Sequence, residues 1–172
     1  MEWCGYEDLA DRLGPETIVL HLAASNSDVS DRETAMRVNV EFTLQVARQA
    51  SQARVATFVF VSSFHALDTS NRGAYAESKR AAVARLMEVE GLNLVVMTLP
   101  AVYGATWAGA LAPLGMIPRP PARALFGLAK ALRPTVDVRV VADALTRIAK
   151  EGPRESDLIL SDDLSHNVAY RV

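Results

Sequence analysis

The sequence predicts an α/β fold in which helices cover both faces of a mostly parallel sheet, forming three layers. Three continuous apolar runs, at 17–22, 57–61 and 94–99, have the length and the β-branched content of strands buried on both faces. Helical patterns separate these runs, and strands that alternate with helices usually pair in parallel. Each run ends in small or polar residues, at the edge of the sheet where ligands bind in such folds.

The elements follow one another without a linker that would mark a second domain. In chain order, we expect a helix at 6–13, a strand at 17–22, a helix at 31–53, a strand at 57–61, a helix at 75–90 and a strand at 94–99. Beyond these we expect a helix at 122–132, a short strand over 136–141, a helix at 143–150 and a last strand at 158–160. With 172 residues, the chain is expected to form one domain, 1–172.

The composition excludes several classes of protein. The formal net charge is −2 and the pI is about 5.9, so we expect no nucleic-acid partner. Cys4 is the single cysteine, which excludes an internal disulfide, and it has no neighbouring histidine, so we expect no metal site there. The first residues lack the basic and apolar regions of a signal peptide, and we expect a cytoplasmic protein.

Residues 91–118 carry no charge and are long enough to span a bilayer. However, Pro100 and Pro113 interrupt the segment, together with Gly104, Gly109 and Gly115. We therefore interpret it as a buried strand that runs into an apolar loop, and we expect no membrane partner.

The stretch from Tyr75 to Lys79 is the strongest candidate for chemistry. On a helix, a spacing of four residues places the two side chains on one face, one turn apart. A tyrosine hydroxyl has an ordinary pKa of about 10, and we expect the lysine ammonium to lower it. A tyrosine tuned in this way could exchange a proton with a substrate hydroxyl or carbonyl. The alternative is a surface helix with a tyrosine anchored in the core and a solvated lysine.

Further motifs surround this pair in a definite order between about residues 17 and 145. They are Leu20-His21-Leu22-Ala23-Ala24, Val38-Asn39-Val40, Val61-Ser62-Ser63, the Tyr75/Lys79 pair, Leu99-Pro100-Ala101-Val102-Tyr103-Gly104 and, less distinctly, Val141-Ala142-Asp143. The ordered set resembles the short-chain dehydrogenase/reductase superfamily, in its extended branch of NAD-dependent epimerases and dehydratases. The resemblance implies a partial Rossmann-like fold, with substrate-side elements at about 104–172.

The resemblance also implies roles for individual residues. Tyr75 would be the general acid/base, Lys79 would lower its pKa and bind the nicotinamide ribose, and Ser63, rather than Ser62, would orient the oxygen of a small-molecule substrate. The cofactor would be NAD or NADP. Its binding residues would be Leu22, Ala23, Ala24, Asn39, Tyr75, Lys79, Pro100, Ala101 and Val102. Asn39 could equally be a structural polar residue, and we also expect a structural role for His21 within its apolar strand. His65 could touch the substrate, but we prefer to interpret it as a loop histidine.

The sequence departs from the extended branch in two respects. Thr98 and Ala101 stand where many nucleotide-sugar enzymes carry an Arg and an Asn, which weakens the case for a nucleotide-sugar substrate. The second departure is that none of the nine glycines has the Gly-x-x-Gly-x-x-Gly spacing that opens the family's pyrophosphate site. We therefore expect a chain that starts at an internal methionine and keeps the catalytic half of the enzyme.

Two functions remain open at this point. The first is a nicotinamide-dependent oxidoreductase or epimerase/dehydratase, and the second is a cofactor-free remnant that acts only as an interaction module. Two lost charged hydrogen bonds to the pyrophosphate, at roughly 1.5–3 kcal/mol each, would weaken cofactor binding by about two to four orders of magnitude. We expect weak NAD(P) binding by the chain alone, and a homodimer through the helices at 31–53 and 75–90.

Overall fold

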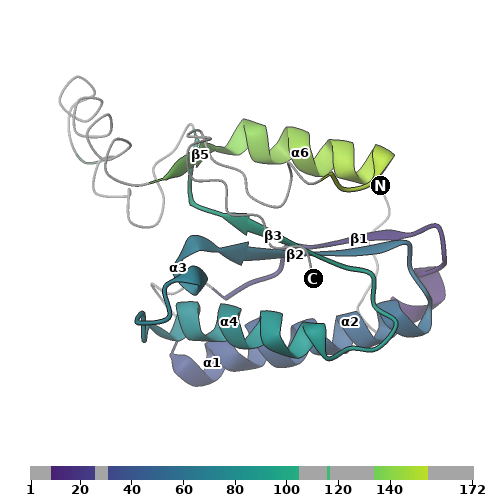
Figure 1. The fold of residues 1–172 in the computed structure, drawn as a ribbon, viewed down its shortest axis with the longest axis horizontal. Helices are drawn as coiled ribbons and strands as arrows, with labels where there is room; N and C mark the ends of the chain where they lie inside the picture. The colour runs from purple at the N-terminus through teal and green to yellow at the C-terminus, as the bar shows by residue number, and fades with distance from the viewer. Residues whose placement is uncertain (1–8, 26–30, 105–115, 117–133, 155–172) are drawn as a thin grey trace.

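The computed structural model describes residues 9–25, 31–104, 116 and 134–154, and these form the three layers that the sequence predicts (Figure 1). The central layer is a parallel sheet with the strand order β1-β2-β3. Its strands are β1 (Ile18–His21), β2 (Thr57–Ser63) and β3 (Leu94–Leu99). The three strands expected from the apolar runs are confirmed, and β2 continues two residues further than expected.

The strands pair so that the candidate site residues leave the sheet at one edge. Ser63, the last residue of β2, pairs with Leu99, the last residue of β3. Side chains along β2 alternate between two cores: Phe58 and Phe60 pack with α2 and α4, whereas Val59 packs on the opposite face. All three are fully buried, which explains why this strand is a continuous apolar run.

One face of the sheet is covered by two long helical segments (Figure 1). The first consists of α1 (Arg32–Met36), the π-helical segment η3 (Arg37–Phe42) and α2 (Thr43–Gln52), which follow without a break, and the second is α4 (Ala74–Met87). The side chain of Asp31 caps α1. The helix expected over 31–53 is therefore confirmed, except that its middle is π-helical, a feature that is frequent at functional sites.

The opposite face carries α6 (Val138–Glu151), with a small parallel pair of strands, β4 (Ala101–Tyr103) and β5 (Thr135–Asp137), beside it (Figure 1). The expected strand over 136–141 is wrong beyond Asp137, where α6 begins. The side chain of Asp137 accepts a hydrogen bond from the Arg139 backbone N at 2.8 Å and so caps this helix. The expected helix at 143–150 belongs to α6.

Other boundaries differ in detail. A 3₁₀ turn, η2 (Ala10–Arg12), lies within the helix expected at 6–13, and α4 ends three residues before position 90. A short helix, α3 (Phe64–Leu67), which the sequence did not suggest, follows β2. The elements expected at 122–132 and 158–160, together with Cys4, lie outside the described residues. Within the described ranges, no helix combines the length and apolar character needed to cross a bilayer.

Candidate active site

Ser63 ends β2 and also caps the short helix α3. Its Oγ accepts a hydrogen bond from the His65 backbone N at 3.3 Å, and its side chain, as a hydrogen-bond donor, lowers the pKa of the Tyr75 hydroxyl. Because the Oγ is an acceptor toward the backbone, its hydrogen is free to be donated to the tyrosine oxygen. Of the two serines considered from the sequence, Ser63 is therefore the one that meets the tyrosine.

Tyr75 lies in the first turn of α4, where the structure brings it together with Ser63 and Lys79. The lysine Nζ is 5.9 Å from the centre of the tyrosine ring. Burial raises the pKa of the Tyr75 hydroxyl, and the hydrogen bond with Ser63 opposes this rise. The expectation that Lys79 lowers the tyrosine pKa is therefore not met in the free protein, where burial dominates.

Lys79 is almost completely buried, with 3% of its surface exposed. Its Nζ donates a hydrogen bond to the carbonyl oxygen of Val61 at 2.8 Å and lies 4.6 Å from the centre of the Phe60 ring. Burial lowers the pKa of this amine to about 8. The structure therefore contradicts the alternative interpretation, in which Lys79 is solvated.

His21 is buried beneath the sheet and faces the helical layer. Its Nε2 lies 2.9 Å from the Oγ1 of Thr43, and its ring is stacked against Phe58 and Phe60. Burial, and secondarily the charge of Lys79, lowers the pKa of His21 to about 4. The ring is therefore neutral near pH 7, and its contacts are those of a structural residue. His65, in contrast, is exposed in α3.

Asn39 lies in the π-helical segment and is completely buried. Its side-chain amide is bonded to both the backbone N and the backbone O of Ser25, at 2.7 and 3.0 Å. Ser25 follows Ala23 and Ala24 directly, so the asparagine holds the loop after β1. Within the described residues its contacts are with protein groups, which supports the structural alternative.

Ser78 is the site residue that sequence reasoning missed. It is completely buried, accepts a hydrogen bond from Asn39 Nδ2 at 2.9 Å and donates one to the Tyr75 carbonyl oxygen at 2.9 Å. The signal that could have identified it is its position three residues after Tyr75, because a polar residue at this spacing falls on the helix face that the pattern predicts to be buried.

The remaining predicted cofactor residues follow β1, in the loop from Leu22 to Ala24, or follow β3, at Pro100 and in β4. Leu22 is 55% exposed and Val102 is 39% exposed, although both are apolar. Pro100 is buried and turns the chain from β3 into β4, and Ala101 is exposed. Exposed apolar side chains at the ligand-binding edge of a parallel sheet offer a surface for a planar ring.

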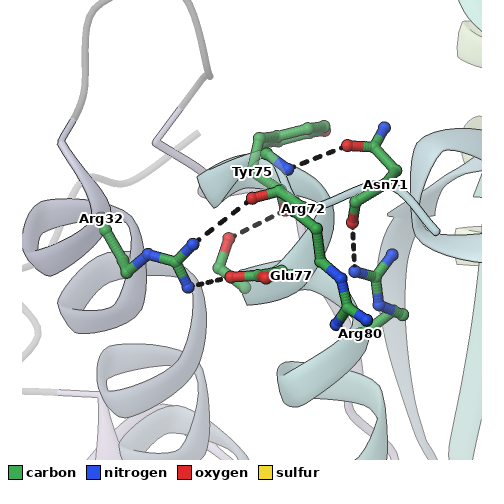
Figure 2. A network of polar contacts seen from close by, with 8 residues as sticks. Arg32, Asn71, Arg72, Tyr75, Glu77 and Arg80 are labelled. Carbon is green, nitrogen blue, oxygen red and sulfur yellow. Dashed lines mark hydrogen bonds and ion pairs between the residues drawn. The ribbon is translucent and has the colours of Figure 1, made fainter. Parts of the chain in front are cut away.

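Two arginines fix the loop that enters α4 (Figure 2). Arg80 donates to the carbonyl oxygen of Asn71, whereas Arg32 of α1 donates to the carbonyl oxygen of Arg72 and forms an ion pair with Glu77. Figure 2 shows both guanidinium groups directed toward the backbone just before the first turn of α4. These contacts fix the start of the helix that carries the candidate acid/base.

Histidine, cysteine and carboxylate side chains of the described residues form no cluster of three that could hold a metal ion. The candidate residues are one serine, one tyrosine and one lysine at the carboxyl edge of the sheet. Such a set can transfer a proton and orient an oxygen atom.

Several solved structures share this fold. The enzyme WbmG of Bordetella bronchiseptica, solved in complex with NAD, has a TM-score of 0.61 and 21% sequence identity, with 84% of this chain and 50% of that chain covered. DesIV of Streptomyces venezuelae, a dTDP-glucose 4,6-dehydratase solved with NAD and TYD bound, has a TM-score of 0.62 and 17% identity, with 88% and 52% covered.

A third structure of this kind is the UDP-N-acetylglucosamine 4-epimerase of Methanobrevibacter ruminantium M1, in complex with UDP-N-acetylmuramic acid. It has a TM-score of 0.60 and 17% identity, with 86% of this chain and 56% of that chain covered. At these identities the likeness shows the fold, and this chain spans about half the length of the structures that it matches.

No protein with a curated description matches the sequence. The sequence profile of the NAD dependent epimerase/dehydratase family, in contrast, matches residues 6–159, which include every candidate residue. That range takes in most of the 172 residues. The chain therefore belongs to the NAD-dependent epimerase/dehydratase family.

Proposed function

We propose that the chain carries the acid/base machinery of an NAD(P)-dependent oxidoreductase or epimerase/dehydratase, with Tyr75 as the group that transfers the proton. The observation that carries this proposal is the grouping of the three side chains: the Lys79 Nζ lies 5.9 Å from the centre of the Tyr75 ring, and Ser63 lowers the pKa of the Tyr75 hydroxyl as a hydrogen-bond donor. The three residues come from the end of β2 and the first half of α4, at the edge of the sheet where ligands bind in parallel folds.

Each residue has a separate role in this proposal. Tyr75 exchanges a proton with a hydroxyl or carbonyl oxygen of the substrate, and Ser63 donates a hydrogen bond to the same oxygen. Lys79 is a positive charge that favours the phenolate once a ligand excludes water from the site. In the free protein burial keeps the tyrosine protonated, as the raised pKa of its hydroxyl indicates.

Lys79, Leu22 and Val102 have side chains that fit the nicotinamide side of the cofactor. A lysine ammonium has three N–H donors, and within the described residues a single hydrogen bond of Lys79, to Val61, accounts for one of them. The donors that remain could bind ribose hydroxyl groups, and the exposed side chains of Leu22 and Val102 could cover the nicotinamide ring. When bound, the nicotinamide supplies the hydride acceptor or donor of the reaction.

The substrate in this proposal is a small molecule with a secondary alcohol or ketone, because this is the group that a tyrosine acid/base and a nicotinamide can oxidise or reduce together. Structures with this fold have been solved with UDP-glucose and with UDP-N-acetylmuramic acid. Nucleotide sugars are therefore the first substrates to test, although Thr98 and Ala101 differ from the pattern of many such enzymes.

The second candidate is an interaction module without cofactor chemistry. It is favoured by the glycine spacing, because a pyrophosphate site of the Gly-x-x-Gly-x-x-Gly kind cannot be built from the nine glycines of this sequence. The two candidates differ in one observable property, which is transfer of hydride to NAD that depends on Tyr75.

The experiment that tests the proposal is a hydride-transfer assay with the whole chain, NAD or NADP at millimolar concentration, and a panel of UDP- and dTDP-sugars. We expect slow formation of reduced cofactor (for an oxidoreductase) or of an epimerised or dehydrated sugar (for an epimerase/dehydratase, which returns the hydride). Either product should be abolished in Tyr75→Phe and retained in Ser51→Ala, which removes a hydroxyl near the far end of α4. Turnover that persists in Tyr75→Phe would contradict the role given to Tyr75. No turnover in the wild-type chain with any sugar would favour the second candidate.

Homodimer formation through the segments 31–53 and 75–90 remains a prediction. The exposed positions on α2 and α4 are mainly polar, for example Gln45, Arg48 and Arg85, whereas Met87 is an exposed large apolar residue. Sedimentation at micromolar concentration tests the prediction, and a monomer would contradict it.

A further inference from the structure

A continuous chain of hydrogen-bonded polar groups, buried at its centre, runs from the loop after β1 to the first turn of α4. Its members are the Ser25 backbone, the Asn39 side chain, the Ser78 hydroxyl and the Tyr75 carbonyl oxygen, and the distances along it are 2.7 to 3.0 Å. Asn39 and Ser78 have no exposed surface. Burial of an amide and a hydroxyl is costly unless both are hydrogen-bonded, and here both are.

The chain joins three elements that are far apart in the sequence. Ser25 belongs to the loop that carries the predicted cofactor residues Leu22 to Ala24, Asn39 belongs to the π-helical segment, and Ser78 lies between Tyr75 and Lys79 on α4. An apolar pair at the positions of Asn39 and Ser78 would fill the same space but would leave the backbone groups of Ser25 without these partners. The polar pair therefore fixes the loop relative to the helix.

We propose that Ser78 is a positioning residue, which together with Asn39 holds the first turn of α4 so that the Tyr75 hydroxyl meets Ser63. Ser78 touches no reacting atom. It acts through the carbonyl oxygen of Tyr75, to which it is bonded, and through Asn39 it keeps the loop after β1 against the same turn. Its significance for catalysis rests on the proposed function, but its effect on Tyr75 does not require turnover.

The consequence can be measured in the titration of the tyrosine. The hydrogen bond from Ser63 lowers the pKa of the Tyr75 hydroxyl against the effect of burial. If Ser78 holds the turn, its loss moves the tyrosine away from Ser63 and raises this pKa further. Ser63→Ala removes the bond itself and defines the largest rise that the mechanism allows.

The experiment is an NMR titration of the whole chain with isotope-labelled tyrosine, with Tyr75→Phe used to assign the signal. We expect an upward shift of the Tyr75 pKa in Ser78→Ala, no larger than that in Ser63→Ala. Asn39→Asp has nearly the same shape but lacks the amide donor that bonds Ser78, and should raise the pKa as well. In the double variant Asn39→Asp/Ser78→Ala, the shift of the Tyr75 pKa should be smaller than the sum of the two single shifts, because both changes break the same chain of hydrogen bonds.

Ser51→Ala is the matched control, because its Oγ donates to the Glu90 carbonyl oxygen at 2.6 Å, near the other end of α4. This variant removes a serine–carbonyl bond too, but should leave the Tyr75 titration unchanged. Should Ser78→Ala not fold, Ser78→Cys keeps the size and a weak hydrogen bond, and an upward shift is again expected.

A lower melting temperature with an unchanged Tyr75 titration in the Ser78 variants would overturn the inference, since it would leave Ser78 a merely structural role. Absence of hydride transfer in the wild-type chain, accompanied by the expected titration shifts, would instead contradict the proposed function alone.

Discussion

The helical layer beneath the sheet has two halves that bury different kinds of side chain. The half at the carboxyl ends of the strands buries the polar residues His21, Asn39, Thr43, Ser78 and Lys79. The other half buries apolar residues: Leu44, Ala47, Ala50, Phe58 and Leu86. Because buried polar groups contribute less to stability than apolar groups of the same volume, we expect the apolar half to contribute most of the stability, whereas the polar half carries the proposed site.

The largest effect is expected from a truncation in the apolar half. Leu86 is 1% exposed and belongs to the core between α2, α4 and the sheet. Leu86→Ala should lower the free energy of unfolding by about 3–4 kcal/mol, through lost transfer energy and a residual cavity. Chemical denaturation measures it, and Met87→Ala, at an exposed position of the same helix, is the control. A loss below about 1 kcal/mol would contradict the assignment of this half as the main core.

In the polar half, the buried imidazole of His21 should make stability depend on pH. Its pKa is about 4 in the folded protein, whereas an unfolded histidine has a pKa of about 6.5. Between these values the unfolded chain binds more protons than the folded chain. The contribution of neutral His21 to the free energy of unfolding is therefore complete above pH 6.5 and is lost as the pH falls toward 4.

The free energy of unfolding should fall by about 3 kcal/mol at most through this effect of His21. Chemical denaturation at a series of pH values measures the fall. His21→Gln should flatten the profile between pH 4 and 6.5, and an equally steep profile in that variant would exclude His21 as the cause.

The sequence predicted those parts of this organisation that depend on local pattern. The strands appeared as continuous apolar runs because both faces of the sheet are covered, and Ser63, Tyr75 and Lys79 could be placed at one edge because parallel strands end together. The raised pKa of Tyr75 could not be predicted, because it depends on burial, which is a property of the tertiary packing. The bond between Asn39 and Ser78 joins residues 39 positions apart, which no local pattern encodes.

Lys79 belongs to the polar half, and we expect burial of its charge to lower the free energy of unfolding. Burial lowers its pKa to about 8 from an ordinary 10.5, so the amine is still protonated at neutral pH but its charge costs free energy in the folded state. Lys79→Met should therefore raise the free energy of unfolding at pH 7 by about 1–3 kcal/mol, the lost bond to Val61 limiting the gain. The wild type should gain stability as the pH rises from 8 to 10.5, and the variant should lack this gain. Lower stability of the variant at pH 7 would show that the charge stabilises the fold.

The smallest effect is expected at the far end of α4. Gly91 has a φ of +71°, and a Cβ atom there would lie 3.5 Å from the Oγ of Ser51, an ordinary contact. Gly91→Ala should therefore cost only the conformational strain, about 1 kcal/mol. Thermal unfolding measures this loss, and Ala84→Gly, at an exposed position within the helix, provides a reference of similar size. A loss of several kcal/mol would mean that this end of the layer is packed more tightly than the distances indicate.

The central claim is that the polar half forms the nicotinamide side of a cofactor site. An NMR titration of the chain with NAD and with NADP to millimolar concentration tests it most directly. We predict weak binding, with a dissociation constant well above the micromolar range. Signals of Tyr75, of Lys79 and of the loop from Leu22 to Ala24 should shift in the wild type and not in Lys79→Met. Shifts confined to other residues, or the same shifts in Lys79→Met, would contradict the account.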